Sequence, residues 1–229
     1  MHFYTGDIHG ETDRFYQLET ADGKKPGAGD TVFVTGDAGL VFFPEGTEGY
    51  YQAERRMREL AGLPFTICFV DGNHENFDRL YKYPKKLWNG GYVHELAPNV
   101  LHLMRGEVYE IDGKRYFAMG GAYSIDKYLR KEGLSWWALE LPTEAEYKNA
   151  ERNLKDAGMR VDVILSHQAP REIIRRMGKH PDAHDRELTG FLEWIMYEVS
   201  YDKWYFGHWH DDKDIDAKHR LLWFDTLSE

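Results

Sequence analysis

Residues 3–10 read FYTGDIHG, a short apolar run followed by a glycine and by two side chains that can bind a metal ion, Asp7 and His9. The run has the length and composition of a buried β-strand, and the glycine permits a sharp turn where the strand ends. In an extended strand end, residues two apart point to the same side, so we expect Asp7 and His9 to face one ion together. The segment therefore predicts a strand whose end carries chemistry.

The same arrangement recurs along the chain. Four further apolar runs lead into a small residue followed by a side chain able to bind a metal ion: 31–34 before Gly36-Asp37, 65–70 before Gly72-Asn73, 161–165 before Ser166-His167, and 204–206 before Gly207-His208. The last block continues to His210, and an extended backbone there would place two imidazoles on one side and turn Trp209 away. A single pair of this kind is often accidental, whereas five blocks in series are specific.

Helical segments are expected between these strands, over 11–18 and 50–61, the second ended by Gly62 and Pro64. A later helix begins at Asp185 as a cap and carries one apolar face, made of Leu188, Phe191, Leu192, Ile195, Met196 and Val199. Residues 107–119 predict an antiparallel hairpin that turns at Asp112-Gly113. This mixed order favours an α+β fold of two packed sheets flanked by helices over one doubly wound sheet.

Composition narrows the class of protein. The chain has 229 residues, 42% of them hydrophobic, and a net charge of −10, so we expect one folded domain over residues 1–229. No apolar stretch approaches the ~18 residues of a membrane span, and residues 1–7 do not form a secretory signal, so a cytoplasmic location without a membrane partner is expected. The single cysteine, Cys68, excludes an internal disulfide and is expected to be buried. The acidic balance gives no strong nucleic-acid signal.

The five blocks, in this order, resemble the calcineurin-like metallophosphoesterase superfamily, and the resemblance runs from residue 6 to residue 210. It implies an αββα architecture, a two-sheet β-sandwich flanked by helices, with a binuclear site at the strand ends. It assigns Asp7, His9 and His210 to one metal, Asn73, His167 and His208 to the other, and Asp37 to the bridge between them. It also makes His74 the catalytic histidine, which contacts the phosphate and protonates the leaving oxygen.

The implied cofactors are two divalent metal ions. One carboxylate can span a two-metal site ~3.5 to 4 Å across. Oxygen and imidazole ligands without thiolate are compatible with Mn, Fe, Zn, Ni or Co, and availability decides among them. Manganese is our first expectation.

The second block departs from the pattern of the protein-serine/threonine phosphatases, Gly-Asp-x-x-Asp-Arg-Gly. Leu40 and Val41 stand where those relatives carry the acid that orients the histidine and the arginine that helps to hold phosphate. Glu45 and Glu48 are candidate replacements for the acid. The departure favours action on a small or nucleotide phosphoester over action on a phosphoprotein.

A phosphate-facing cation is expected from residues 120–130, GGAYSIDKYLR, where the candidates are Lys127 and Arg130. Trp136 and Trp137 are candidates to stack on a base or to wall the pocket. The alternative for all four is an ordinary surface role, with solvated cations and a packed tryptophan pair.

The sequence thus predicts a metal-dependent phosphoesterase that acts on a small-molecule or nucleotide phosphomonoester or phosphodiester. Two alternatives stay open. One is a nuclease that uses the same two ions, which would need a basic groove for the strand. The other is a metal-binding scaffold whose catalytic ability has been lost. The oligomeric state is not predicted.

Overall fold

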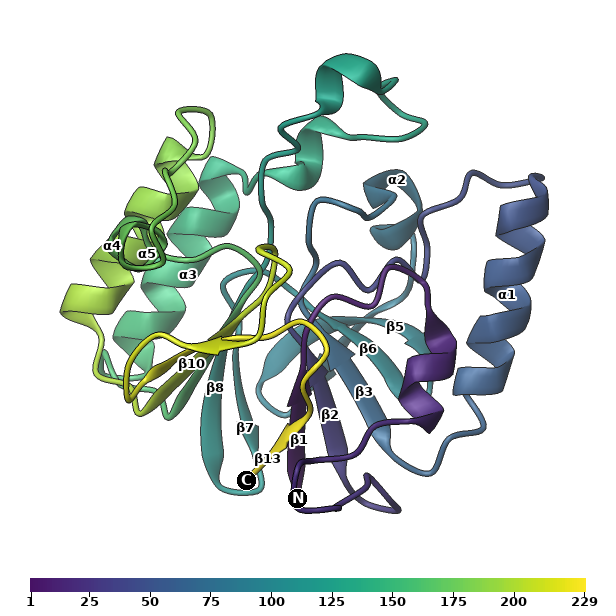
Figure 1. Cartoon of the computed structure of the whole chain (residues 1–229), viewed down its shortest axis with the longest axis horizontal. Helices are drawn as coiled ribbons and strands as arrows, with labels where there is room; N and C mark the ends of the chain where they lie inside the picture. Colours follow the sequence, from purple (N-terminus) through teal and green to yellow (C-terminus); the bar gives the residue numbers. More distant parts are fainter.

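The computed structural model describes residues 1–229, and two mixed β-sheets form its centre (Figure 1). The seven-stranded sheet has the order β13 (Leu227–Ser228), β1 (His2–Thr5), β2 (Thr31–Val34), β3 (Thr66–Phe69), β6 (Val100–Leu103), β5 (Gly91–Ala97), β4 (Lys85–Trp88). The six-stranded sheet has the order β11 (Lys213–Asp214), β12 (His219–Leu221), β10 (Lys203–Phe206), β9 (Val163–Ser166), β8 (Lys114–Met119), β7 (Val108–Ile111). All five apolar runs that the sequence singled out are strands.

Parallel pairing aligns the strands that lead into the polar blocks. In the first sheet β1, β2, β3 and β6 run parallel, and in the second β8, β9, β10 and β12 do. Parallel strands buried on both faces read as continuous apolar runs. Their carboxyl ends lie along one edge of each sheet. The predicted hairpin is confirmed, because β7 pairs antiparallel with β8 around Asp112-Gly113.

Helices cover the outer face of each sheet (Figure 1). One side carries the 3₁₀ turn η1 (Thr12–Tyr16), α1 (Glu48–Leu60) and α2 (Phe77–Leu80), and the other carries α3 (Glu144–Asp156), α4 (Arg171–Arg176) and α5 (Arg186–Glu198). Two short 3₁₀ turns, η2 (Lys127–Leu129) and η3 (Ala138–Glu140), lie in the connection between β8 and α3. The predicted two-sheet α+β architecture is confirmed.

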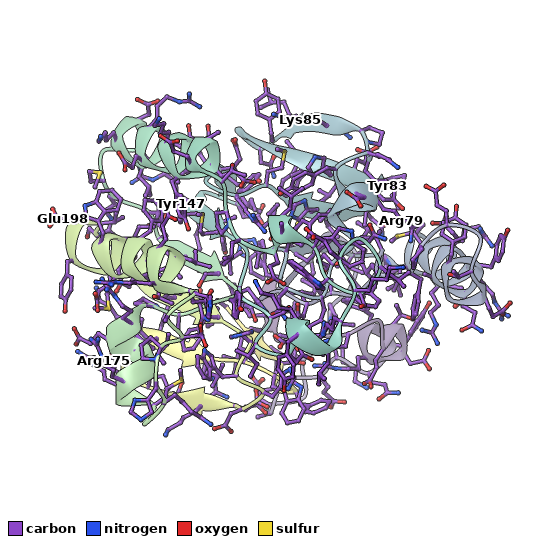
Figure 2. All side chains as sticks on the ribbon, turned by 90° about the horizontal axis from the view of Figure 1, so that it is seen from above. Arg79, Tyr83, Lys85, Tyr147, Arg175 and Glu198 are labelled. Carbon is purple, nitrogen blue, oxygen red and sulfur yellow. The ribbon has the colours of Figure 1, made fainter.

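The hydrophobic core has three parts, one under each helical layer and one between the sheets. Between the sheets the Tyr4 ring stacks on Tyr205 with centroids 4.2 Å apart, and its hydroxyl lies 2.9 Å from that of Tyr116. Figure 2 shows Tyr147 of α3 directed toward α5, where its ring meets Phe191 with centroids 4.9 Å apart. Aromatic rings thus join the two sheets and, within one helical layer, join α3 to α5.

Local chemistry explains where the helices begin. Thr47 caps α1 by accepting from the backbone N–H of Tyr50, and Thr143 forms a capping box with Glu146 at the start of α3. The predicted helix over 11–18 is not an α-helix, because this segment forms only the shorter 3₁₀ turn η1. The sequence did not predict α3 or the meander β4 to β6.

Two further predictions concern burial and membranes. Cys68 is fully buried in β3, as expected. None of the helices combines the length and the hydropathy that a membrane-spanning segment needs.

Candidate metal centre

The carboxyl ends of the central parallel strands bring together side chains that are distant in sequence. The ligand atoms of Asp7, His9 and His210 lie within 4.8 Å of one another, and so do those of Asp7, Asp37 and His167. Residues from both sheets therefore meet in one cluster. This convergence follows from parallel topology, since equivalent ends of parallel strands share an edge.

One half of the cluster surrounds the carboxylate of Asp7. Its Oδ2 lies 3.2 Å from His210 Nε2 and 3.9 Å from His9 Nε2, and the two imidazole nitrogens are 3.1 Å apart. Asp7 is buried, whereas His9 and His210 are exposed enough to reach solvent. Three ligand atoms thus converge on one point that a solvent ion can reach.

The other half surrounds His167, which is fully buried. Its Nε2 lies 3.3 Å from both Asn73 Oδ1 and Asp37 Oδ2, and its ring centroid is 5.0 Å from that of His208. The same Asp37 Oδ2 lies 3.9 Å from His9 Nε2 in the first half. Asp37 is therefore placed between the two groups.

The backbone at the site departs from the extended form that the sequence suggested. His9, Asp37, His208 and His210 adopt positive φ angles of 49°, 44°, 71° and 47°, in a region that non-glycine residues rarely occupy. The side chains converge because tight turns aim them, and strand alternation plays no part. Trp209 correspondingly lines the cavity beside the site, so the expectation that it turns away was wrong. Such strained residues each cost of order 1–3 kcal/mol and cluster at functional sites.

Glycines before the polar residues are required by close packing. A Cβ atom at Gly36, whose φ is +107°, would lie 2.0 Å from His167 Nδ1. A Cβ at Gly72 would lie 2.0 Å from Asp37 Oδ1. The glycines therefore allow the chain to approach the site side chains without a clash.

Charge at the site is compensated by imidazoles. Burial opposes the charge of Asp37, but His167 and the other nearby histidines hold the pKa of its carboxyl below the ordinary value. The same carboxylate raises the pKa of His167 against the effect of burial. No lysine or arginine nitrogen lies within 4.0 Å of the carboxylate oxygens of Asp7 or Asp37, whose close partners are histidines. The carboxylates are thus available to an ion.

His74 lies at the edge of the cluster. Its backbone N–H donates to Asp37 Oδ1 at 2.7 Å, and its two ring nitrogens each lie 3.4 Å from a terminal nitrogen of Arg130. Burial lowers the pKa of His74, with Arg130 adding to this effect. Arg130 also pairs with Asp126 at 2.7 Å. The guanidinium therefore faces the site from the loop after β8, although Val41 occupies the position of the family arginine.

Three supporting residues were not predicted from the sequence. Glu75 is fully buried: its Oε1 accepts from Gly39 N–H at 3.1 Å and its Oε2 has no partner, and burial together with Asp37 raises its pKa well above the ordinary value. Ser124 accepts from the Asn73 amide at 3.1 Å, which leaves Asn73 Oδ1 facing His167. Arg14 donates to the carbonyl oxygen of Asp7.

The sequence could have indicated Glu75 as a site residue, because it directly follows His74 in the third block. Nothing local marks Ser124 or Arg14, whose roles depend on contacts between distant segments. The candidate acids Glu45 and Glu48 are exposed, and Glu45 lines a separate cavity beside Arg79. They do not reach the site.

Of the four predicted substrate-contacting residues, some lie at the cavity and others do not. Arg130 lines the cavity next to the site. Lys127 Nζ lies over the rings of Tyr123 and Trp136, 4.2 and 4.9 Å from their centroids. Trp137 is only 3% exposed, packs in the core on the helical side, and donates its indole N–H to Asp78 at 3.0 Å. The structure therefore brings Arg130 to the cavity and places Trp137 away from it.

A cavity of about 460 Å³ opens beside the cluster. Its lining includes Asp37, Asn73, His74, His208 and His210. Asp185 lines the same cavity; it is 2% exposed, and burial raises its pKa to about 6. The pocket is large enough for a small phosphoester.

The raised pKa of Asp185 predicts a pH-dependent effect on stability. The folded state binds this proton more tightly than the unfolded state, so the carboxyl destabilises the protein above about pH 6, and this penalty disappears as the pH falls toward 4. Asp185→Asn should therefore raise the free energy of unfolding by about 2–3 kcal/mol at pH 8 and by much less at pH 4.5. Urea unfolding at the two pH values measures the difference.

The matched control for this prediction is Asp156→Asn, at the exposed end of α3. It should change stability little and equally at both pH values. An equal gain for Asp185→Asn at pH 8 and pH 4.5 would contradict the assignment of a destabilising buried charge.

Comparison with known proteins finds a curated relative and several similar chains of known structure. No family model matches the chain. The lariat debranching enzyme of Schizosaccharomyces pombe is 28% identical over 161 residues, which is 64% of this chain and 33% of that enzyme. A Staphylococcus aureus protein assigned as a 5′-nucleotidase, crystallised with alpha-ketoglutarate, aligns at 13% identity and a TM-score of 0.49 over 96% of this chain and 47% of that one. The sulfate thiohydrolase SoxB of Thermus thermophilus aligns at 16% identity and a TM-score of 0.40, over 95% and 37%.

The predicted resemblance to the calcineurin-like metallophosphoesterase superfamily is confirmed by the two-sheet fold and by this relative. The relative is itself an enzyme. The chain spans about a third of its length.

Proposed function

We propose that the chain is a metal-dependent phosphoesterase that hydrolyses a small-molecule or nucleotide phosphoester at a binuclear site. The proposal is carried by the position of Asp37, whose Oδ2 lies 3.3 Å from His167 Nε2 and 3.9 Å from His9 Nε2, between two groups of ligand atoms. A bridging carboxylate needs this placement.

The donor set fits two divalent ions. Asp7, His9 and His210 would hold one ion, Asn73, His167 and His208 the other, and Asp37 both. Carboxylate, carbonyl and imidazole donors without thiolate suit Mn, Fe, Zn, Ni or Co, with Mn as the first choice for a test. When bound, two such ions stabilise the charge on the phosphoryl oxygens and lower the pKa of an attacking water.

The residues of the chain would orient and stabilise the phosphoester. Arg130 presents a guanidinium at the cavity, where it can bind phosphate oxygens with two N–H groups. His74, on the edge of the cluster, can donate a ring N–H to the phosphate or to the leaving oxygen. The buried carboxyl of Glu75 holds the turn that carries Gly39, and the hydroxyl of Ser124 holds the side-chain amide of Asn73. Hydrolysis would then proceed by in-line displacement at phosphorus.

A nuclease is a second candidate, favoured by the similarity to a lariat debranching enzyme. Its substrate would be a phosphodiester within a nucleic acid. The net charge of −10 counts against binding a long strand, since such binding depends on clustered lysine and arginine. Cleavage of a labelled oligonucleotide with strong salt dependence would favour this candidate.

The proposal predicts metal-dependent turnover. Protein stripped with a chelator should not hydrolyse bis(p-nitrophenyl) phosphate or p-nitrophenyl phosphate, and added Mn²⁺ should restore hydrolysis of at least one of them by about a hundredfold or more. The faster substrate identifies the ester class. No turnover with any first-row divalent metal would count against the enzyme and favour a metal-binding scaffold.

A further inference from the structure

The residues that line the cavity beside the candidate metal centre include a second group of mutual contacts with a different character. We call it the acidic end and define it by Tyr123, Gln168, Asp182, Asp185 and Trp209, all of which line the cavity. The only lysine or arginine that lines the cavity is Arg130, which is near His74 and pairs with Asp126. At the acidic end, neither carboxylate forms an ion pair with a lysine or arginine: Asp182 pairs with His184, and Lys127 acts on it only from a distance.

Asp185 is the buried acid of this group, where the side-chain amide of Gln168 holds its carboxylate and the backbone N–H of Tyr123 approaches it. It precedes α5 at the cap position, but its side chain makes no capping hydrogen bond. Its Oδ2 accepts from the side-chain amide of Gln168, whereas Oδ1 has no partner, although the residue is 2% exposed. An unpaired buried carboxylate oxygen costs free energy, so its position at the wall of a cavity points to a ligand that supplies the missing donor.

The surroundings of Asp185 are ordered and aromatic. Gln168 Oε1 accepts from the Trp209 indole N–H at 3.0 Å, so one amide holds both the carboxylate and the indole. Tyr123 stacks on His184 with centroids 4.5 Å apart, and His184 Nδ1 lies 2.9 Å from Asp182. The Tyr123 ring also carries Lys127 Nζ at 4.2 Å from its centroid. Asp185 thus lies in an ordered wall in which the Trp209 indole borders the cavity.

This chemistry selects a class of ligand. A carboxylate oxygen accepts from amino and ring N–H groups, and aromatic walls favour planar rings. A second phosphate would be repelled by Asp182 and Asp185. Phosphate would instead be held at the end that contains Arg130 and the metal ligands.

We propose that the acidic end binds the base of a nucleotide substrate, and that Asp185 accepts a hydrogen bond from an exocyclic amino group of that base. The inference rests on the proposed function, because it places the scissile phosphate at the metal centre. On this proposal Asp185 determines substrate specificity, and the preferred substrate is a phosphoester of a nucleoside whose base carries an amino group.

The test compares substrates that differ by one amino group. The 5′-p-nitrophenyl phosphodiesters of guanosine and inosine differ only in the 2-amino group, and those of adenosine and purine riboside differ only in the 6-amino group. With Mn²⁺-loaded enzyme, kcat/KM should be at least about tenfold higher for the amino-bearing member of one pair. The reason is that a substrate without the amino group leaves the buried Asp185 acceptor unpaired. Asp185→Asn and Asp185→Ser should each reduce this ratio to below about threefold. Asp156→Asn, a distant change of the same charge, should preserve it.

Two results would overturn the proposal: wild-type ratios below threefold in both pairs, or a ratio that persists in both Asp185 variants. Failure of the proposed function gives a different pattern, since wild-type protein would then not hydrolyse bis(p-nitrophenyl) phosphate with any metal. In that case calorimetry with the free nucleosides still tests the acidic end. Tighter binding of the amino-bearing nucleoside, lost on changing Asp185, supports the base site, and equal binding rejects it.

Discussion

Asp37→Asn is expected to lower kcat/KM for a metal-dependent diester by about a thousandfold or more. The carboxylate lies between the two ligand groups, so its loss removes a charge that both proposed ions would share. Asparagine keeps the size of the side chain and an oxygen that can accept from the His74 N–H. The fold should therefore persist while metal affinity and turnover fall together.

Three measurements on this variant separate loss of chemistry from loss of structure. Elemental analysis after metal loading gives the metal content. Hydrolysis of bis(p-nitrophenyl) phosphate gives the turnover. Circular dichroism and urea unfolding show whether the variant is folded. Asp156→Asn serves as the charge-matched control and should behave as wild type. A folded Asp37→Asn protein with wild-type turnover would reject the two-metal assignment.

His74→Ala is expected to retain metal and to lose about 10²- to 10⁴-fold in rate, the usual contribution of a positioned acid–base group. The bond from residue 74 to Asp37 comes from the backbone, so alanine leaves it in place. What the variant removes is the ring beside Arg130. Added imidazole should restore part of the rate.

Metal content decides between two roles for this side chain. The ligand atoms of His9, Asp37 and His74 also lie within 4.8 Å of one another, so the geometry is compatible with direct coordination. Loss of about one metal equivalent in His74→Ala would make His74 a ligand and contradict its proposed role toward phosphate.

Much of the site could be predicted because parallel topology converts sequence order into spatial proximity. Asp7, Asp37, Asn73 and His167 each follow a central strand, so their meeting follows from the order of the sheets. The turns that aim His208 and its neighbours could not be predicted, since residues other than glycine rarely adopt positive φ.

Other features depend on tertiary contacts that no local pattern records. The cap residue of α5, Asp185, turns to Gln168 instead of to its own helix. Trp137 enters the core although the neighbouring Trp136 stays half-exposed. The strand β4 is mostly exposed and carries two lysines, so it has no apolar run to reveal it. Its partner β5 supplies the pairing that makes it a strand.

The site also lies where the two sheets meet, with consequences for how the protein unfolds. Asp7, Asp37 and Asn73 follow strands of one sheet, whereas His167, His208 and His210 follow strands of the other. Ions bound by all of these residues would cross-link the two sheets, and a chelator would remove this cross-link. By thermodynamic linkage, a ligand at a thousand times its dissociation constant stabilises the native state by about 4 kcal/mol. Removing the ions with a chelator should therefore make the two sheets unfold less cooperatively, and it should also abolish turnover.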